Sequence, residues 1–136
     1  MASFNKFQPF VEDLAEKVHN LGSDQLAAAL TNSAPNATDD QLSDITEISY
    51  TNCSSRAITT TSSEQTGGTY KLVLTDLVLT ASGGTVGPLR YVVLYNDTAT
   101  NDELIGYWDY GSSITLADGE TLTLDFDASN GVLQVT

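Results

Sequence analysis

The stretch SITLADGETLTLDF, residues 113–126, decides the fold class of this chain. Apolar residues alternate with Ser, Thr or Asp on both sides of a central ADGE sequence. Alternation with a period of two is typical of a β-strand with one buried face, and Asp-Gly between two such runs is a signal for a tight turn. We therefore predict an antiparallel β-hairpin, which buries the apolar side chains Ile114, Leu116, Leu122, Leu124 and Phe126.

Most of the chain after Gly22 consists of similar short segments separated by turns. Thr, Val, Leu, Ile and Ser dominate the segments, and Gly, Pro and Asn separate them. Such a series predicts a mainly β fold, an antiparallel jelly-roll-like β-sandwich of about eight strands. The other expected strands are residues 26–31, 45–50, 56–63, 70–81, 89–95, 103–110 and 132–136.

Two of the expected strands are apolar on both faces. They are the run from Leu72 to Leu79 and the run from Tyr91 to Tyr95. A strand of this kind needs cover on both sides. The opposing sheet supplies one cover, and we expect the other to come from a helix or from another subunit.

One helix is expected, over about residues 8–20 at the N-terminus. Apolar residues recur there at steps of three and four, Pro9 suits the first turn, and Gly22 suits a left-handed end. The helix packs either on the sheet of its own domain or on a neighbouring subunit. The second arrangement is favoured by Phe4 and Phe7, which lie outside the expected helix.

Length and charge exclude several classes of protein. The 136 residues predict a single domain, 1–136, with the helix at about 8–20 and the sandwich over about 25–136. The 18 Asp and Glu against 5 Lys and Arg give a net charge of −13, which argues against a nucleic-acid partner. We also expect no membrane partner, because no apolar run approaches the roughly 20 residues of a membrane span. The N-terminus does not resemble a signal peptide.

Motifs for catalysis or metal binding are missing from the sequence. Cys53 and His19 are the only residues of their types, and neither stands in a nucleophile motif. The DFDAS sequence at 125–129 begins like a calcium loop, but the Gly comes at Gly131 and Thr136 stands where Glu is required. We therefore predict no enzymatic activity, no metal and no cofactor. Cys53 is interpreted as an inert loop thiol and His19 as a helix-end residue.

The YWDY sequence at 107–110 leaves two interpretations open. On a strand, Trp108 and Tyr110 face one side while Tyr107 and Asp109 face the other, so Asp109 is only a nominal candidate for a glycosidase carboxylate. In the first interpretation, Trp108 belongs to the core and Tyr107 lies at a surface or an interface. In the second, the three aromatic residues form the sugar-stacking surface of a carbohydrate-binding β-sandwich.

Several phrases of the sequence carry a resemblance to a known class of protein. They are FNKF at 4–7, VEDLA at 11–15, HNLG at 19–22, YVVLYND at 91–97 and IGYWDYGSS at 105–113. With these phrases the chain resembles small structural proteins of tailed bacteriophages that are encoded among the head genes. Some of these proteins are similar to capsid decoration proteins, which are also called cement proteins.

The resemblance implies a function without chemistry. It implies a jelly-roll-like protein that forms a homodimer or homotrimer on the outer surface of the capsid. The expected partners are the major capsid protein and further copies of this chain, and the expected location is the exterior of a virion made in the bacterial cytoplasm. It transfers no catalytic or metal-binding residue, and it leaves open a place on the head shell, the neck or the tail.

Aromatic residues and charge together give an expected contact surface. Residues 96–136 contain eight acids and no Lys or Arg, whereas residues 49–95 are nearly neutral. Burying unpaired carboxylates is costly, so we expect the ADGE turn to face solvent and the helix region, with residues 49–95, to face the capsid. The interface residues expected on this basis are Phe4, Phe7, Tyr91, Tyr95, Tyr107 and Trp108.

Overall fold

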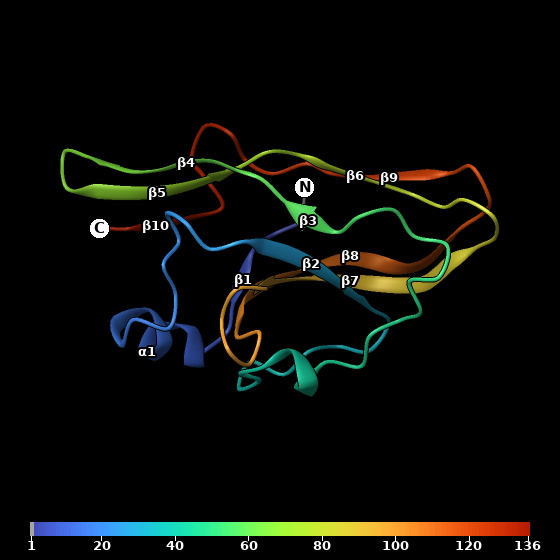
Figure 1. Ribbon diagram of the computed structural model, residues 1–136, viewed down its shortest axis with the longest axis horizontal. Coiled ribbons are helices and arrows are strands. Elements are labelled where there is room, and N and C mark those ends of the chain that lie inside the picture. Colours follow the sequence, from blue (N-terminus) through green and yellow to red (C-terminus); the bar gives the residue numbers. More distant parts are fainter. Residues whose placement is uncertain (1) are drawn as a thin grey trace.

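The computed structural model describes residues 2–136 as a mainly β protein with one α-helix (Figure 1). The antiparallel β class expected from the alternating segments is confirmed. The elements are β1 (Asn5–Lys6), α1 (Pro9–Ala15), β2 (Leu26–Thr31), the 3-10 turn η1 (Leu42–Asp44), β3 (Ala57–Ile58), β4 (Thr60–Thr66), β5 (Thr69–Leu74), β6 (Leu77–Thr80), β7 (Val86–Asn96), β8 (Leu104–Leu116), β9 (Thr121–Leu124) and β10 (Leu133–Val135).

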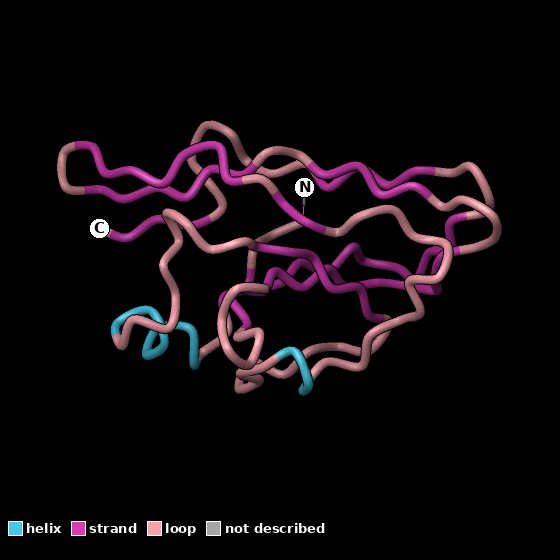
Figure 2. The backbone as a smooth tube through the Cα atoms, in the orientation of Figure 1, coloured by secondary structure: helices cyan, strands magenta, loops and turns pink. Residues whose placement is uncertain are grey.

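The strands form two layers, with helical turns on the outside of one of them. One layer is a five-stranded sheet in the order β1-β8-β7-β2-β3, and the other contains the sheets β10-β5-β4 and β6-β9. Figure 2 shows α1 and η1 on the side of the five-stranded sheet that faces away from the second layer. The hydrophobic core therefore has two parts, one between the layers and one beneath the helical turns.

The strand from Tyr91 to Tyr95 is covered on both faces, as expected. In β7 the residues from Val92 to Tyr95 are buried, and in the adjacent β2 all six residues are buried. The second layer covers one face of these strands. The other face is covered by the chain itself, through buried residues before and after α1 such as Phe7, Phe10 and Leu21. No partner is needed to cover them.

The expected single strand over residues 70–81 is wrong. Thr75 and Asp76 interrupt it, and its two halves, β5 and β6, pair in different sheets. Only one face of β6 is buried, because Leu79 is fully buried whereas Val78 is 51% exposed. The expected strand at 45–50 is also absent as a regular element, with a single bridge between Glu47 and Thr31 in its place.

The expected hairpin over residues 113–126 is wrong in its pairing. The alternation is present, but β8 pairs with β7 and β9 pairs with β6. The turn between them binds neighbouring backbone: the Gly119 amide donates to the Ala81 carbonyl at 2.7 Å, and the Ala81 amide donates to the Glu120 carbonyl at 3.0 Å. The turn therefore carries the chain from one layer to the other. Alternation specifies a buried face for each strand, but it does not specify the partner strand.

The helix is shorter than the apolar stripe predicted. It ends at Ala15, where the Val18 amide donates to the Asp13 carbonyl at 2.9 Å and the Lys17 amide donates to the Leu14 carbonyl at 3.5 Å. Lys17 has φ of 72°, so this lysine, and not Gly22, is the left-handed residue that ends the helix. The apolar stripe continued to Leu21 because the irregular segment after α1 also faces the core.

Candidate functional site

Two of the six expected interface residues lie in the core of the chain. Phe7 is fully buried beneath the five-stranded sheet, and Tyr95 is only 4% exposed. They are unavailable for contact with a partner, and their assignment to an interface was wrong. The sequence suggested it because Phe7 lies before the expected helix, but its amide donates to the Ile105 carbonyl and draws the ring against β8.

The other four expected interface residues are half-buried and divide between the two faces of the five-stranded sheet. On the face that carries α1, the Tyr107 ring lies 5.2 Å from the Phe7 ring and 6.4 Å from the Tyr91 ring, between centroids. On the face between the layers, the Trp108 ring lies 5.1 Å from Phe4 and 5.5 Å from Phe126. Tyr107 and Trp108 therefore cannot contribute to one flat aromatic platform.

Trp108 lines a partly open cavity of about 190 Å³ between β8 and β9. Its walls are mainly apolar, with Tyr110 at the exposed side and Asp125 as the charged residue. This position places Trp108 half-buried against the core and not within it. It contradicts a sugar-stacking surface made by Tyr107, Trp108 and Tyr110 together, because Tyr107 lies on the opposite face.

Asp109 is paired with Arg90 on the surface. The Nε atom of Arg90 donates to Oδ1 of Asp109 at 2.9 Å, and its Nη2 atom donates to Oδ2 at 3.1 Å. The hydrogen bonds from Arg90 and the Gly111 amide lower the pKa of Asp109. A carboxylate held in its charged form is unsuited to donate a proton, so the pairing argues against Asp109 as a glycosidase acid.

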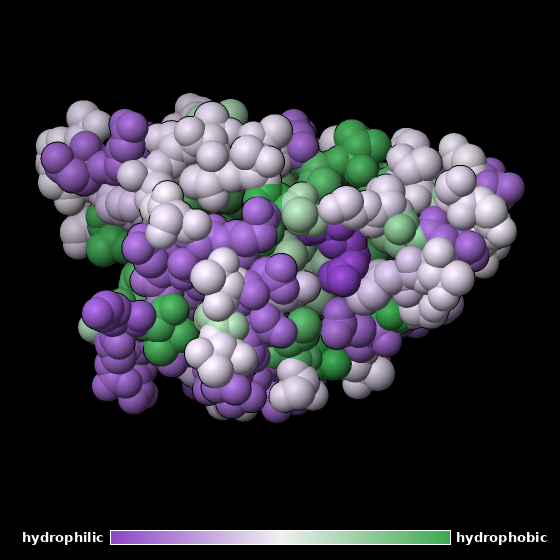
Figure 3. Space-filling view, viewed as in Figure 1, coloured by the Kyte–Doolittle hydropathy of each residue, from purple (hydrophilic) through white to green (hydrophobic). Residues whose placement is uncertain are grey.

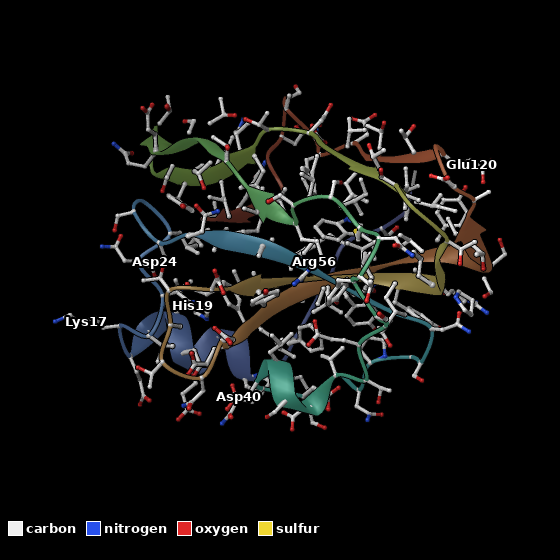
Figure 4. All side chains as sticks on the ribbon, turned by 45° about the vertical axis from the view of Figure 1, so that its right-hand side comes forward. Lys17, His19, Asp24, Asp40, Arg56 and Glu120 are labelled. Atoms are coloured by element: carbon white, nitrogen blue, oxygen red, sulfur yellow. The ribbon has the colours of Figure 1, made fainter. Side chains whose placement is uncertain are left out.

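The histidine is buried, although the sequence suggested a residue at the end of a helix. His19 lies beyond α1, is 5% exposed and packs on Phe10 with ring centroids 5.2 Å apart. The Nδ2 atom of the fully buried Asn96 lies 3.0 Å from Nδ1 of His19 and donates to Oδ2 of Asp24 at 2.7 Å. Burial lowers the pKa of His19. Figure 4 shows His19 and Asp24 side by side next to α1.

Carboxyl groups from three segments of the chain lie within electrostatic reach of one another, and two of them, Asp40 and Glu103, also act on His19. Together with His19 they form a group that we call the α1 carboxyl cluster: Asp13, His19, Asp40 and Glu103. Each of the four side chains has a buried polar atom without a hydrogen-bond partner in the described structure. The pKa of Asp13 is raised to about 7 by burial, by a hydrogen bond with Asp40 and by the charges of Asp40 and Glu103.

No pattern in the sequence indicated this cluster. Asp40 and Glu103 stand in polar, acidic stretches that are typical of solvated loops. The fold brings them together because the Leu104 amide donates to the Asp40 carbonyl at 2.8 Å and Gln41 forms a bridge with Glu103. The loop before η1 is thereby fixed to the start of β8, beneath α1.

Arg56 is a further charged residue, outside the α1 carboxyl cluster, that no sequence pattern indicated. Its guanidinium lies 3.6 Å from the centroid of the Tyr50 ring, and its Nη1 atom donates to the Ala28 carbonyl at 2.6 Å. These contacts hold the loop that contains Cys53 over β2. Burial raises the pKa of the Cys53 thiol, which supports the interpretation of this cysteine as unreactive.

The calcium-like sequence at 125–129 forms a local turn. Oδ1 of Asp127 accepts hydrogen bonds from the amides of Ser129 and Asn130, at 2.9 and 2.8 Å. Within residues 2–136, no group of three or more His, Cys, Asp or Glu is arranged to hold a metal ion. In the same range, no helix is both long enough and apolar enough to cross a membrane.

Comparison with known proteins adds no relative to these observations. No family model, no curated protein and no solved structure matches the chain.

Proposed function

We propose that this chain is a non-enzymatic structural protein of a tailed-bacteriophage virion, which decorates the outer surface of the capsid and stabilises the shell. The proposal includes the jelly-roll-like topology and the partners that the resemblance implies, namely the major capsid protein and further copies of this chain. The two packed antiparallel layers support a rigid module of this kind. The observation that carries the proposal is the separation of charge between the two outer sides of the molecule.

Acidic residues gather on the side of the five-stranded sheet that carries the helical turns. Eleven of the 18 acids belong to α1, to the segments around η1 and to the loops before β2 and β8: Glu12, Asp13, Glu16, Asp24, Asp39, Asp40, Asp44, Glu47, Asp97, Asp102 and Glu103. Hydrophilic side chains over this region are visible in Figure 3. Because like charges repel and stay hydrated, this side is suited to solvent.

The outer face of the second layer is uncharged at its centre, with Glu64 opposite Lys71 toward one end and the exposed Asp125 after β9. Alternation turns the buried Leu72, Leu74 and Leu79 inward, and leaves short polar and β-branched residues outside. We call the outward residues at the centre of this layer the neutral face: Ser62, Val73, Val78, Thr80, Thr121 and Thr123. Val73 lies opposite Ser62, Val78 opposite Thr123 and Thr80 opposite Thr121 across the two pairs of strands.

The neutral face is the surface that we propose to contact the capsid. It can be buried without desolvating a carboxylate, whereas burial of the α1 side would require a dense patch of Lys and Arg on the partner. This orientation differs from the one expected from the sequence, in which the helix region contacted the shell. Charge summed along the chain was a poor guide, because the acids of residues 96–136 divide between both sides of the fold.

The proposed mechanism is stabilisation by mass action. A protein that binds the expanded shell and not its earlier form favours the expanded shell by its free energy of binding. The effect is repeated at every symmetry-related site, so modest affinity at each site is sufficient. No chemical step is required of the protein.

Capsids purified without this protein provide the direct test. The wild-type chain should co-sediment with them, and electron microscopy of the saturated particles should place it on the outside of the head. Failure to bind, or density on the neck or tail only, would contradict capsid decoration. Binding of the free protein on a glycan array would instead support a carbohydrate-binding module.

Two exposed valines provide a matched pair of variants for the contact face. Val78 on the neutral face is 51% exposed and Val11 on α1 is 53% exposed. Val78→Glu should weaken co-sedimentation by at least about tenfold, because it places a charge in the interface, while Val11→Glu should leave binding unchanged. The reverse result would place the α1 side against the capsid. Thermal unfolding of both variants serves as the control for folding.

A further inference from the structure

The α1 carboxyl cluster joins four segments of the chain at the place where α1 rests on the five-stranded sheet. Asp13 belongs to α1, and His19 lies in the segment that follows it. Asp40 lies in the loop before η1, and Glu103 is the residue immediately before β8. Figure 4 shows Asp40 and His19 on the same side of the sheet as α1. The interactions of these side chains therefore decide how firmly α1 is held.

His19 and Glu103 of the cluster are buried, Asp13 and Asp40 are half-buried, and each of the four side chains has an unpaired polar atom. His19 is 5% exposed and Glu103 is 7% exposed, yet Nε2 of His19 and Oε2 of Glu103 have no hydrogen-bond partner among the described atoms. The same holds for Oδ2 of Asp13 and Oδ1 of Asp40. Buried polar groups are paired in nearly all native proteins, so the unpaired atoms of Asp13 and Asp40, whose side chains lie within hydrogen-bonding reach of each other, indicate a missing donor between them.

A proton on either Asp13 or Asp40 would supply the missing donor. Two carboxylate oxygens both accept hydrogen bonds, so Asp13 and Asp40 can bond to each other only when one of them carries a proton. The tautomer of His19 follows from its neighbour. Nδ1 of His19 accepts a hydrogen bond from the side-chain amide of Asn96. The ring hydrogen is therefore on Nε2, which is a donor toward the carboxylates.

All the charged groups that act on Asp13 and His19 are acidic. The charges that act on Asp13 come from Asp40, Glu103 and Glu12, and all of them are negative. Those that act on His19 come from Glu103, Asp24 and Asp40. When the proton leaves, adjacent carboxylates of like charge remain in a poorly hydrated site, which is unfavourable.

We propose that the α1 carboxyl cluster is a proton-operated latch, in which one proton shared by the Asp13 and Asp40 carboxyls holds α1 on β8. Loss of this proton loosens α1 and the segment that follows it. The helix is suited to such a motion, because it has seven residues and no side-chain hydrogen bond at its N-cap. The latch is independent of the proposed capsid function.

The direction of the pH effect follows from the two titrating groups. Because the pKa of Asp13 is raised to about 7, its contribution to stability is present at low pH and is lost as the pH rises through about 7. The lowered pKa of His19 acts in the opposite direction, since its contribution is present above the usual pKa of 6.5 and is lost as the pH falls through its own lower value. The latch is therefore tightest on the acid side of neutrality, above the pKa of His19.

Hydrogen exchange of the full-length protein tests the latch. After correction for intrinsic rates, protection of the amides of residues 12–19 should fall by at least about tenfold, relative to β7, between about pH 6 and about pH 8.5. Asp13→Asn should remove this change, because its amide donates to Asp40 at every pH. Asp125→Asn removes the same charge from an exposed position and should retain the wild-type change.

A second measurement on the wild type keeps the test independent of the variants. The side-chain carboxyl signal of Asp13 in a carbon NMR titration should show its midpoint near pH 7. Equal protection at both pH values, or a midpoint near the usual aspartate value, would overturn the proposal. Restoration of protection at high pH by added calcium would also overturn it, because the species that completes the cluster would then be a metal ion.

Discussion

At the scale of single residues, a glycine in β8 determines how the aromatic side chains next to it pack. Gly106 leaves room for the Phe4 ring, which then packs on Trp108. A β-carbon at Gly106 would meet the end of that ring and would lie 2.8 Å from the Asn5 carbonyl oxygen. The absence of a side chain at one position thus allows the N-terminal segment to seal the edge of the core.

Gly106→Ala should destabilise the protein by about 1–3 kcal/mol, the usual effect of overpacking a core. Urea unfolding measures it. Phe4→Ala should also destabilise, but the double variant should be more stable than the sum of the two effects predicts, because removal of the ring relieves the clash. A Gly106→Ala protein within about 0.5 kcal/mol of wild type would show that Phe4 does not occupy this position.

At the scale of elements, the ADGE turn and the end of α1 both differ from what their residue types suggest, because contacts elsewhere in the fold decide their conformation. The ADGE turn has the composition of a hairpin turn, yet its Glu120 side chain accepts from the Ala117 amide at 2.6 Å and its Asp118 side chain accepts from the Gly83 amide at 3.0 Å. These bonds hold a connection between layers. For α1, the sequence offered Gly22 as the left-handed end, and the fold uses Lys17.

Lys17→Gly should stabilise the protein by about 0.5–1 kcal/mol, because glycine adopts a positive φ without steric cost. Gly22→Ala is the matched control. Gly22 does not have a left-handed φ, and a β-carbon there would come no closer than 3.5 Å to another atom outside its chain neighbours, so this change should cost less than about 0.5 kcal/mol. Thermal unfolding of both variants checks the assignment. Marked destabilisation by Gly22→Ala with no gain from Lys17→Gly would contradict it.

At the scale of the whole molecule, the fold places an acidic surface, which is suited to solvent, and the neutral face, which is suited to a partner, on opposite sides. The acids of α1, η1 and the adjoining loops lie on one outer side, and the neutral face lies on the other. Of the two apolar runs that suggested a partner subunit, the one from Tyr91 to Tyr95 is covered within the chain, whereas the one from Leu72 to Leu79 leaves Val73 and Val78 on the neutral face. A homodimer or homotrimer stays a prediction that depends on the resemblance.

Light scattering at high micromolar concentration should give a mass of two or three times 14.5 kDa. Because the neutral face is assigned to the capsid, Val78→Glu and Val11→Glu should both leave this mass unchanged. A monomer in free solution would contradict a pre-formed oligomer. The capsid-bound form should then be examined for association that occurs only on the shell.

The sequence by itself determined the β class and the faces of most strands. The alternation in residues 113–126 correctly assigned Leu116, Leu124 and Phe126 to the core, and the apolar run from Tyr91 to Tyr95 indicated cover on both faces. These features depend on the period of the backbone and on transfer of side chains out of water, and both are local properties of the chain. The same reasoning placed Trp108 and Tyr107 on opposite sides of β8.

Only the tertiary structure decided the pairing of strands, the end of α1 and the composition of the α1 carboxyl cluster. The β-period is the same whether a strand pairs with its neighbour in sequence or with another, so residues 113–126 could not reveal that β8 and β9 belong to different layers. Asp13, Asp40 and Glu103 are separated by tens of residues, and in the unfolded chain each is an ordinary solvated acid. The proton that we propose between Asp13 and Asp40 depends on packing, which removes these carboxyls in part from water and brings like charges together.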